Sequence, residues 1–326
     1  MTRRILAIDG GGVRGVIPAV LLAALESATG SPVREQFHFL SGTSTGALIA
    51  GAAATGMPAA QIVDLYLERA PQVFRRTPVL STLRRILAGH GYEVDDLHRL
   101  VVRELERQGA AEWRLNDVPN DLMVTAKGLP DGHPWYFVRD RPEENACRTG
   151  NLLLADCLTA SAAAPTYFQP AQVRGLEDRG PMVDGGTGVA GNPVYQACVE
   201  AFTYSDAYDP ADTIVVSLGT GQYFARPRPT WLYTWLEWVL AELLRSPGEQ
   251  QTELVDRHFA AATFYRIDVV LPWDVPLDDA RRIPELREIG EELAARVDWP
   301  AILAGRDEQW LVTRGRRGAR DYAEEV

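Results

Sequence analysis

The sequence predicts an α/β fold in which a mostly parallel central sheet is flanked by helices on both faces. Short apolar segments at residues 5–8, 37–41, 121–126, 135–138 and 213–218 have the length and composition of buried strands. Longer segments between them have helical composition or helical spacing of their apolar residues. Strands that alternate with helices are typical of a parallel sheet buried on both faces.

The predicted helices follow glycine or proline breaks, or show apolar residues at helical spacing. Two of them come directly after glycine-rich loops, and Pro58 opens a third. A proline closes another, because the alanine-rich segment that ends near residue 163 is followed by Pro165. The expected ranges are 16–25, 47–54, 59–68, 95–108, 152–163 and 284–297.

The length of 326 residues permits one large α/β domain or a core with a modest appendage. We see no internal repeat and no low-complexity linker. We therefore expect a single domain over residues 1–326, with a core at about 3–225 and a helical extension at about 226–326 packed on it. Tryptophans 231, 235 and 238 recur there at helical spacing. This segment fits a helix packed on the sheet, a self-association surface, or an element that faces a membrane.

Composition and charge exclude some classes of protein. The chain is 46% hydrophobic and 24% charged, as in ordinary globular proteins, with a formal net charge of −11. That charge argues against nucleic-acid binding and against constitutive adhesion to anionic membranes. Local basic clusters at residues 75–76, 84–85 and 314–317 are expected on the solvated surface, with a phosphate contact as the alternative.

The chain carries no recognisable targeting segment. Its first apolar run ends at Asp9, too short for a secretory signal, and no stretch approaches 18 uninterrupted apolar residues. Cys147, Cys157 and Cys198 form no CxxC pair. These features suit a reducing compartment, so we expect a cytoplasmic protein.

One motif, Gly-Thr-Ser-Thr-Gly at residues 42–46, lies between a predicted strand and a predicted helix. The small residues Gly42 and Gly46 allow a sharp turn that lifts the Ser44 hydroxyl out of the sheet at a helix N-terminus. The helix dipole and free amides there favour developing negative charge. Ser44 is therefore a candidate nucleophile, although any glycine-rich turn with a central serine would match the pattern.

A second motif, Asp-Gly-Gly-Gly-Val-Arg-Gly at residues 9–15, exposes successive backbone amides that could cradle an anion. The anion could be a phosphate or the oxyanion of a tetrahedral intermediate. The loop lacks the Gly-Lys-Ser/Thr ending of a Walker A motif. Gly10, Gly12 and Gly15 meet a dinucleotide fingerprint, but only Glu35 approximates the expected downstream acid.

A third motif places Asp184 at the end of a predicted short strand, after Pro181-Met182-Val183 and before Gly185 and Gly186. Two flexible glycines let such a carboxylate approach another loop closely. Taken alone, the motif fits an ordinary turn aspartate better than a catalytic one.

Together, the three motifs resemble the patatin-like phospholipase family, in the order that the family has them. The resemblance covers most of the chain, from residue 5 to about 295, and implies a three-layer α/β/α fold. One departure is Gly191-Asn192-Pro193, where the family often has Asn-Asn-Pro. Further stretches that carry the resemblance are residues 160–168, 191–193, 217–221, 265–268 and 277–280.

The resemblance implies a Ser–Asp dyad without a catalytic histidine. Ser44 would attack an ester carbonyl, and Asp184 would accept its proton and later activate the deacylating water. In a Ser–acid–His hydrolase the histidine comes last in the chain, and only His258 follows Asp184. No cofactor or metal is implied.

The resemblance also assigns the glycine loop. The amides of Gly10, Gly11 and Gly12 would form the oxyanion hole. Arg14 would orient that loop or the lipid phosphate. The implied substrates are fatty-acid esters, most often phospholipids or lysophospholipids, reached through transient contact with a membrane surface.

Three hypotheses on function remain open. The first is a constitutive cytoplasmic lipid acyl hydrolase. The second is the same chemistry switched on by a cyclic dinucleotide, as in bacterial defence effectors that degrade membrane phospholipid. The segment between Pro71 and Trp113, which holds two arginine pairs, is the candidate pocket for such an activator. The third is a non-catalytic scaffold or nucleotide-binding protein, against which the presence of both Ser44 and Asp184 argues. Self-association into a homo-oligomer also stays open.

Overall fold

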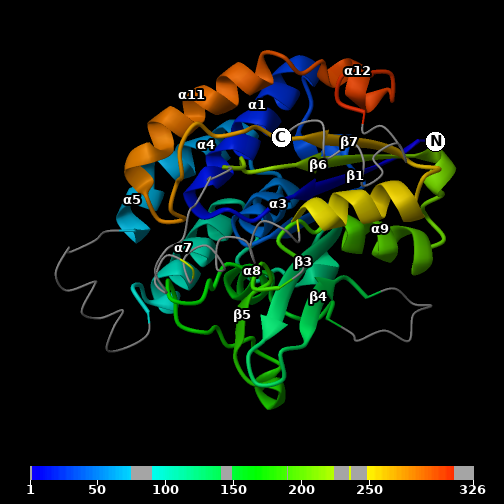
Figure 1. Cartoon of the computed structure of the whole chain (residues 1–326). Coiled ribbons are helices and arrows are strands. Elements are labelled where there is room, and N and C mark those ends of the chain that lie inside the picture. The colour runs from blue at the N-terminus through cyan, green and yellow to red at the C-terminus, as the bar shows by residue number, and fades with distance from the viewer. Residues whose placement is uncertain are drawn as a thin grey trace.

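The computed structural model describes residues 2–74, 90–140, 149–188, 190–223, 235 and 248–311. Over these residues the chain forms a seven-stranded sheet in the order β4-β3-β2-β1-β6-β7, with β5 paired to β3. Helices lie on both sides of this sheet (Figure 1). The predicted fold class is confirmed.

The strands are β1 (Arg3–Ile8), β2 (Phe39–Thr43), β3 (Asp121–Gly128), β4 (Pro134–Val138), β5 (Met182–Asp184), β6 (Thr213–Leu218) and β7 (Thr263–Ile267). The helices are α1 (Val16–Thr29), α2 (Val33–Gln36), α3 (Thr45–Thr55), α4 (Ala59–Glu68), α5 (Ala70–Val73), α7 (Val94–Arg107), α8 (Leu154–Ser161), α9 (Val194–Thr203), α11 (Ile283–Ala294) and α12 (Trp299–Leu303). A 3-10 turn, η1 (Gly12–Gly15), precedes α1, and residues 248–258 are also helical.

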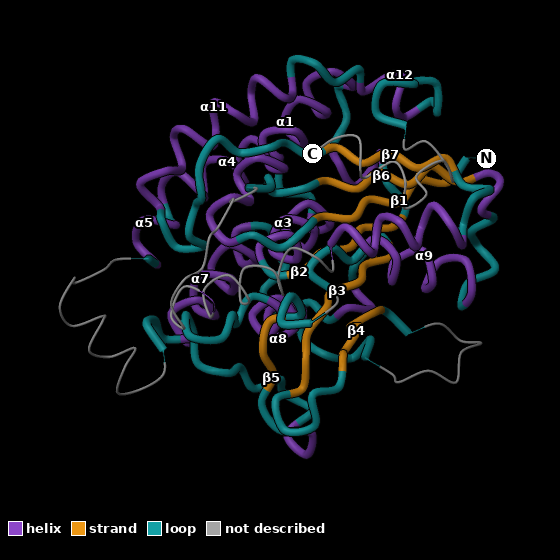
Figure 2. The backbone as a smooth tube through the Cα atoms, in the orientation of Figure 1, coloured by secondary structure: helices purple, strands orange, loops and turns teal. Residues whose placement is uncertain are grey.

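Five of the strands run parallel and end at the same edge of the sheet. β1 pairs in parallel with β2 and β6, β2 with β3, and β6 with β7. Ile8 lies opposite Gly42 and Leu218, and Leu218 lies opposite Ile267. The loops that follow these strands therefore meet at the carboxyl edge, where open α/β sheets bind their ligands. Figure 2 shows the strands of this sheet between the helical layers.

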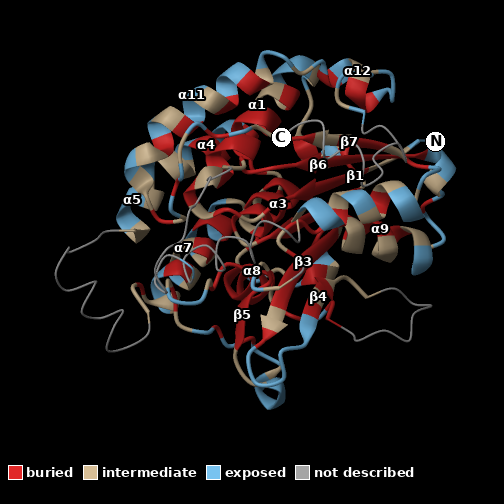
Figure 3. Cartoon of the chain, in the orientation of Figure 1, coloured by how far each residue is buried: buried red, intermediate tan, exposed pale blue. Residues whose placement is uncertain are grey.

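The central strands are buried on both faces, as an uninterrupted apolar run predicts. In β1, Ile5 and Ala7 pack into a core cluster with α9, whereas Leu6 and Ile8 pack into a larger cluster with α1 and α3. The outer surfaces of α9 and α11 are exposed while the sheet is buried (Figure 3). This separation gives the three layers.

Helix α1 is the central helix of the larger core. It packs against α4, α11 and α12. The stretch 12–29 is long and apolar enough to cross a membrane by length and composition, but 56% of it is buried inside the protein. Such burial is typical of a core helix in a globular domain.

Most predicted elements are present with small shifts at their ends, but several further elements were not anticipated. The strand expected to end at Asp184 is present as β5, whereas helix α9 and the short helices α2, α5 and α12 have no clear sequence signal. The helical extension expected over residues 226–326 also supplies a strand, because β7 pairs with β6 in the central sheet. Trp231, Trp238, Cys147 and the basic clusters lie outside the described residues, and Trp235 is exposed.

Candidate active site

Ser44 stands at a strained turn between β2 and α3. Its backbone has φ 57° and ψ −124°, and it is one of two non-glycine residues with positive φ in the described part of the chain. A β-carbon at position 46 would overlap the carbonyl oxygen of Ile8, so only glycine lets α3 begin this close to the end of β1. Strain held in this way by its surroundings is typical of a nucleophile elbow.

The elbow is held from both sides. The Ser44 amide donates a hydrogen bond to the Ser161 hydroxyl at the end of α8, at 2.9 Å. On the other side, Gly10 lies directly against Ser44, with so little space that an added β-carbon would be 3.2 Å from the Ser44 β-carbon. Ser44 is only partly buried, and its side chain lines a cavity.

Asp184 reaches Ser44 because β2 and β5 share one edge of β3. Thr43, the last residue of β2, pairs with Thr125, and Asp184 pairs with the next residue, Ala126. The opposite edge of β3 is occupied by β4. Strand β2 stops pairing with β3 at Thr43, where the chain turns away at Ser44. Asp184 therefore lies on the edge of β3 directly beyond the end of β2.

The Asp184 carboxyl group is buried, with 5% of the residue exposed. Burial raises its pKa from 3.8 to about 6, while hydrogen bonds from the Ser44 hydroxyl and the Gly186 amide act in the opposite direction. The Gly186 amide donates to Asp184 Oδ1 at 2.7 Å, and Gly185 packs against Thr125. A carboxylate with a pKa near 6 is a stronger base than an exposed one and is still largely ionised at neutral pH.

The glycine loop offers two free amides next to Ser44. The Gly10 amide donates to the carbonyl oxygen of Gly191 at 2.9 Å, so it is not available to an oxyanion in this structure. The amides of Gly11 and Gly12 have no acceptor among the described residues. The expected set of three donors is thus reduced to two.

Arg14 is bonded to the protein backbone. Its Nε donates to the Gly11 carbonyl oxygen at 3.3 Å and its Nη1 to the Gly221 carbonyl oxygen at 3.2 Å. Burial lowers its pKa. Of the two roles open to Arg14, these contacts favour orientation of the loop over contact with a lipid phosphate.

Gly12 needs to be glycine for two reasons. Its φ is +57°, and a β-carbon there would overlap the Leu277 carbonyl group. The Val13 amide donates to the same carbonyl oxygen at 2.9 Å. The segment that follows β7 therefore clamps the loop at its far end.

A buried ion-pair network anchors the near end of the loop. Arg266 in β7 donates to both carboxylate oxygens of Asp9, at 2.9 and 2.6 Å, and to Asp268 Oδ2 at 2.8 Å. Its Nη1 also donates to the Ser217 hydroxyl at 2.7 Å. Burial raises the pKa of Asp9 to about 6, with Arg266 acting in the opposite direction. Asp9 directly precedes Gly10, so this network fixes where the glycine loop begins.

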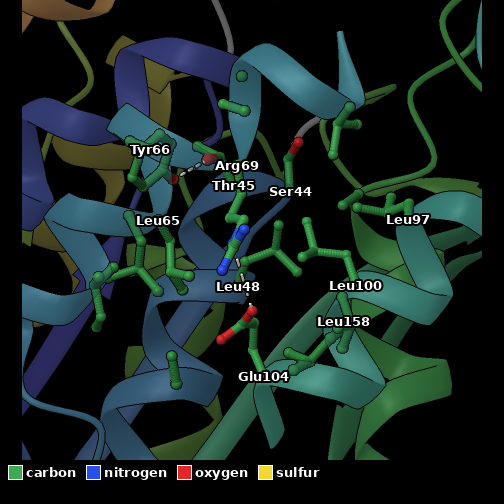
Figure 4. Close-up of a pocket in the computed structure, with 18 of the residues that line it drawn as sticks. Ser44, Thr45, Leu48, Leu65, Tyr66, Arg69, Leu97, Leu100, Glu104 and Leu158 are labelled. Carbon is green, nitrogen blue, oxygen red and sulfur yellow. Dashed lines mark hydrogen bonds and ion pairs between the residues drawn. The ribbon is translucent and has the colours of Figure 1, made fainter.

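An apolar cavity of about 170 Å³ opens beside Ser44. Its wall is built by aliphatic side chains from helices α3, α4, α5, α7 and α8. They include Leu48 of α3, Leu65 of α4, Leu100 of α7 and Leu158 of α8 (Figure 4). Thr45 and Tyr66, whose hydroxyl groups are hydrogen-bonded to each other, lie close to Ser44. Such a wall suits a hydrocarbon chain.

His258 is not part of this site. It is hydrogen-bonded through Nδ1 to the Tyr195 hydroxyl at 2.9 Å, and Tyr195 belongs to α9. Helix α9 packs on one face of the sheet and α3 on the other. Within the described ranges, no group of three or more His, Cys, Asp or Glu side chains could hold a metal ion.

The structure brings together the three motifs singled out in the sequence. It also adds residues that sequence reasoning missed: Ser161, and Arg266 as the partner of Asp9. The signal available for Arg266 was a charged residue inside an apolar strand, which requires a buried partner. Nothing local identified that partner as Asp9, 257 positions away.

A strained serine at a strand–turn–helix elbow, at the carboxyl edge of a parallel sheet, is typical of α/β proteins with a serine nucleophile. The family model described as "Patatin-like phospholipase" matches residues 6–198, more than half of the chain. The chain therefore belongs to the patatin-like phospholipase family.

Two relatives share the name "cGAMP-activated phospholipase". The protein from Escherichia coli strain TW11681 is 30% identical over 227 residues, a match that spans 67% of this chain and 62% of that protein. The protein from Vibrio cholerae is 27% identical and matches over 89% of this chain and 90% of its own length. Among solved structures, the effector ExoU of Pseudomonas aeruginosa aligns over 94% of this chain and 54% of its own, with 13% identity and a TM-score of 0.43.

Replacing Arg266 with methionine is expected to lower the free energy of unfolding by about 3–5 kcal/mol, because the buried Asp9 and the partly buried Asp268 would lose their shared partner. Denaturant unfolding measures this change. Arg257→Met is the matched control, since Arg257 pairs with Glu253 on the surface, where such a change is worth about 1 kcal/mol or less. Equal effects of the two substitutions would contradict the anchoring role of Arg266.

Replacing Asp184 with asparagine is expected to stabilise the protein above pH 6. Because burial raises the pKa of Asp184 from 3.8 to about 6, the folded state keeps a proton that the unfolded state releases. The contribution of Asp184 to stability is therefore present below pH 4 and is lost as pH rises through 6, by up to about 3 kcal/mol.

Denaturant unfolding of both proteins between pH 4 and pH 8 measures this difference. The advantage of the asparagine variant over wild type should grow with pH. Asp178→Asn, at an exposed position, is the control substitution. If the difference in unfolding free energy between Asp184→Asn and wild type does not change with pH, the pKa of Asp184 is not raised in the folded protein.

Proposed function

We propose that this protein is a lipid acyl hydrolase that cleaves carboxylic esters of fatty acids, with Ser44 as nucleophile and Asp184 as base. The observation that carries the proposal is that the Ser44 hydroxyl, which lines an apolar cavity, is hydrogen-bonded to the buried Asp184 carboxyl group, 140 positions away in the sequence. Family membership supports the same reaction class.

In the proposed first half-reaction, the Ser44 hydroxyl oxygen bonds to the ester carbonyl carbon and its proton passes to the Asp184 carboxylate. The tetrahedral intermediate collapses when the alcohol leaves with that proton, so Ser44 carries the acyl group. In the second half-reaction, Asp184 accepts a proton from water, which attacks the acyl carbon. The fatty acid leaves and the proton returns to Ser44.

The proposed oxyanion hole consists of the Gly11 and Gly12 amides. Both lack an acceptor within the described part of the chain, whereas the Gly10 amide is bonded to Gly191. The anchors on either side of the loop hold these donors in place before the reaction, which is how such a hole lowers the barrier. Gly10 then acts by its close packing on Ser44 and not as a donor.

The cavity supports a single fatty acyl chain as the group that is transferred. A water-sized group needs about 10–15 Å³ of such volume, so about 170 Å³ holds roughly a dozen chain groups. We also propose, from the cysteine usage, a cytoplasmic protein and, from the proposed lipid substrates, transient contact with membrane surfaces. The lipid class and the state of self-association stay open.

Ser44→Ala and Asp184→Asn are expected to lose hydrolysis of a fluorogenic fatty acyl ester by about 10²–10⁴-fold, the range that a base or nucleophile supplies. For wild type, kcat/KM should rise with pH through about 6, because the base must be ionised and burial raises the pKa of Asp184 to that value.

Asp178→Asn, far more exposed than Asp184, serves as the control and should retain wild-type activity. Full activity in both dyad variants would refute the proposed chemistry. If wild type cleaves no acyl ester under any condition, that result would support the alternative of a non-catalytic scaffold or nucleotide-binding protein.

A second candidate function keeps this chemistry and adds activation by a cyclic dinucleotide in antiphage defence. The names of the E. coli and V. cholerae relatives favour it. The proposed activator segment between Pro71 and Trp113 lies partly outside the described residues, which resume at residue 90.

Hydrolysis is expected to rise at least tenfold when cGAMP or another cyclic dinucleotide is added, if activation shifts the population of a competent state. A fluorogenic acyl ester assay measures this, with the linear dinucleotide of the same bases as control. Full activity without any nucleotide, unchanged by its addition, would identify the constitutive hydrolase instead.

A further inference from the structure

The apolar cavity contains a cation that the proposed chemistry does not use. Among the described residues that line it, two are charged, Arg69 and Glu104. Arg69 lies between α4 and α5, and Glu104 lies on α7. Figure 4 shows the Arg69 guanidinium group near Leu48 and directed toward Glu104.

Glu104 already has a partner. It is buried, with 7% of the residue exposed, and both of its carboxylate oxygens accept hydrogen bonds from Arg107 Nη1, at 3.0 and 2.8 Å. Arg107 follows one turn later on α7, is half exposed and does not line the cavity. The charge of Glu104 is therefore already balanced by Arg107, without a contribution from Arg69.

Arg69, in contrast, has an ion pair with Glu104 but no hydrogen-bond acceptor for its side chain within the described part of the chain. Its Nε is shielded from solvent and unsatisfied among the described residues, and the nearest carboxylate oxygen, Glu104 Oε1, is 4.0 Å away. That distance is too long for a hydrogen bond. The cluster of Arg69, Glu104 and Arg107 thus carries one net positive charge, on the side that faces the cavity.

A guanidinium group with unused donors in an apolar wall is unfavourable until a ligand supplies an oxygen. A plain hydrocarbon chain cannot supply one, and it would bury the donors further. An oxygen on the chain would accept a charge-assisted hydrogen bond in a low-dielectric site, where such bonds are strong.

We propose that Arg69 is a specificity-determining residue that makes the cavity select acyl chains carrying an oxygen acceptor away from the ester group. The acceptor can be a hydroxyl or carbonyl oxygen within the chain, or a carboxylate at its end. The inference rests on the proposed function, in which the ester group of the same chain lies at Ser44.

The kinetic test compares p-nitrophenyl esters that differ only in the chain. They are the dodecanoate, dodecanoates with a hydroxyl group at successive carbons, and the monoester of dodecanedioic acid. Wild type is expected to prefer at least one oxygenated ester by about tenfold in kcat/KM, the usual effect of a hydrogen bond to a charged group. The position and type of the best substrate identify which oxygen Arg69 binds.

Arg69→Met should reduce that preference to about one, and Arg69→Lys should keep part of it because the charge and donors remain. Each variant is compared with its own rate on the plain ester, so a general loss of activity cancels. Arg99→Met, which removes an exposed arginine of α7, should keep the wild-type preference. The proposal is overturned if wild type cleaves the plain ester at least as well as every oxygenated ester, or if Arg69→Met keeps the preference.

A binding measurement separates failure of this inference from failure of the proposed function. Methyl dodecanoate and its hydroxylated forms compete with a fluorescent fatty acid analogue for the Ser44→Ala protein, which needs no hydrolysis. The hydroxylated esters should bind about tenfold more tightly than the plain ester, and Arg69→Met in the same background should remove the difference. Equal binding by the two kinds of ester would overturn the role of Arg69 even if hydrolysis occurs.

Discussion

The site depends on how one edge of β3 is divided between two partners. β2 pairs with β3 up to Thr125, and β5 takes the same edge from Ala126 onward. The chain must therefore leave the sheet after Thr43. It does so through the strained backbone conformation of Ser44. The antiparallel entry of β5 brings Asp184 to the vacated position. Ser44 and Asp184, the proposed nucleophile and base, are thus placed by backbone hydrogen bonds, which position side chains more rigidly than mobile loops do.

This arrangement destabilises the folded state locally, and interactions elsewhere in the fold must offset that loss. Ser44 is held at positive φ, and ionised Asp184 is buried with a pKa raised to about 6. Both conditions persist because the surrounding structure over-determines them. Ser161 bonds the Ser44 amide, and the double-sided core formed by α1, α3 and α9 supplies the hydrophobic stabilisation. Function and stability oppose each other at Asp184, as is common at active sites.

Sequence reasoning succeeded where the signal is local. The elbow around Ser44 needs small residues at Gly42 and Gly46 within five positions, and the buried strands need uninterrupted apolar runs. It did not succeed where a partner lies far along the chain. The Gly10 amide was expected in the oxyanion hole, but it is bonded to Gly191, a contact that no local pattern encodes. A short strand ending at Asp184 was expected, but no local pattern encodes its pairing with β3, which positions Asp184.

The glycine loop links the two halves of the chain. The family model matches residues 6–198, but three of the groups that hold the loop come later: Thr220, whose hydroxyl donates to the Gly10 carbonyl oxygen, Arg266 and Leu277. Arg266 reaches Asp9 only because β7 adds to the sheet beyond β6. The region after residue 225 therefore holds the glycine loop in place as well as packing on the core. Because it anchors both ends of the loop that supplies the Gly11 and Gly12 amides, the geometry of the proposed oxyanion hole depends on residues from both halves of the chain.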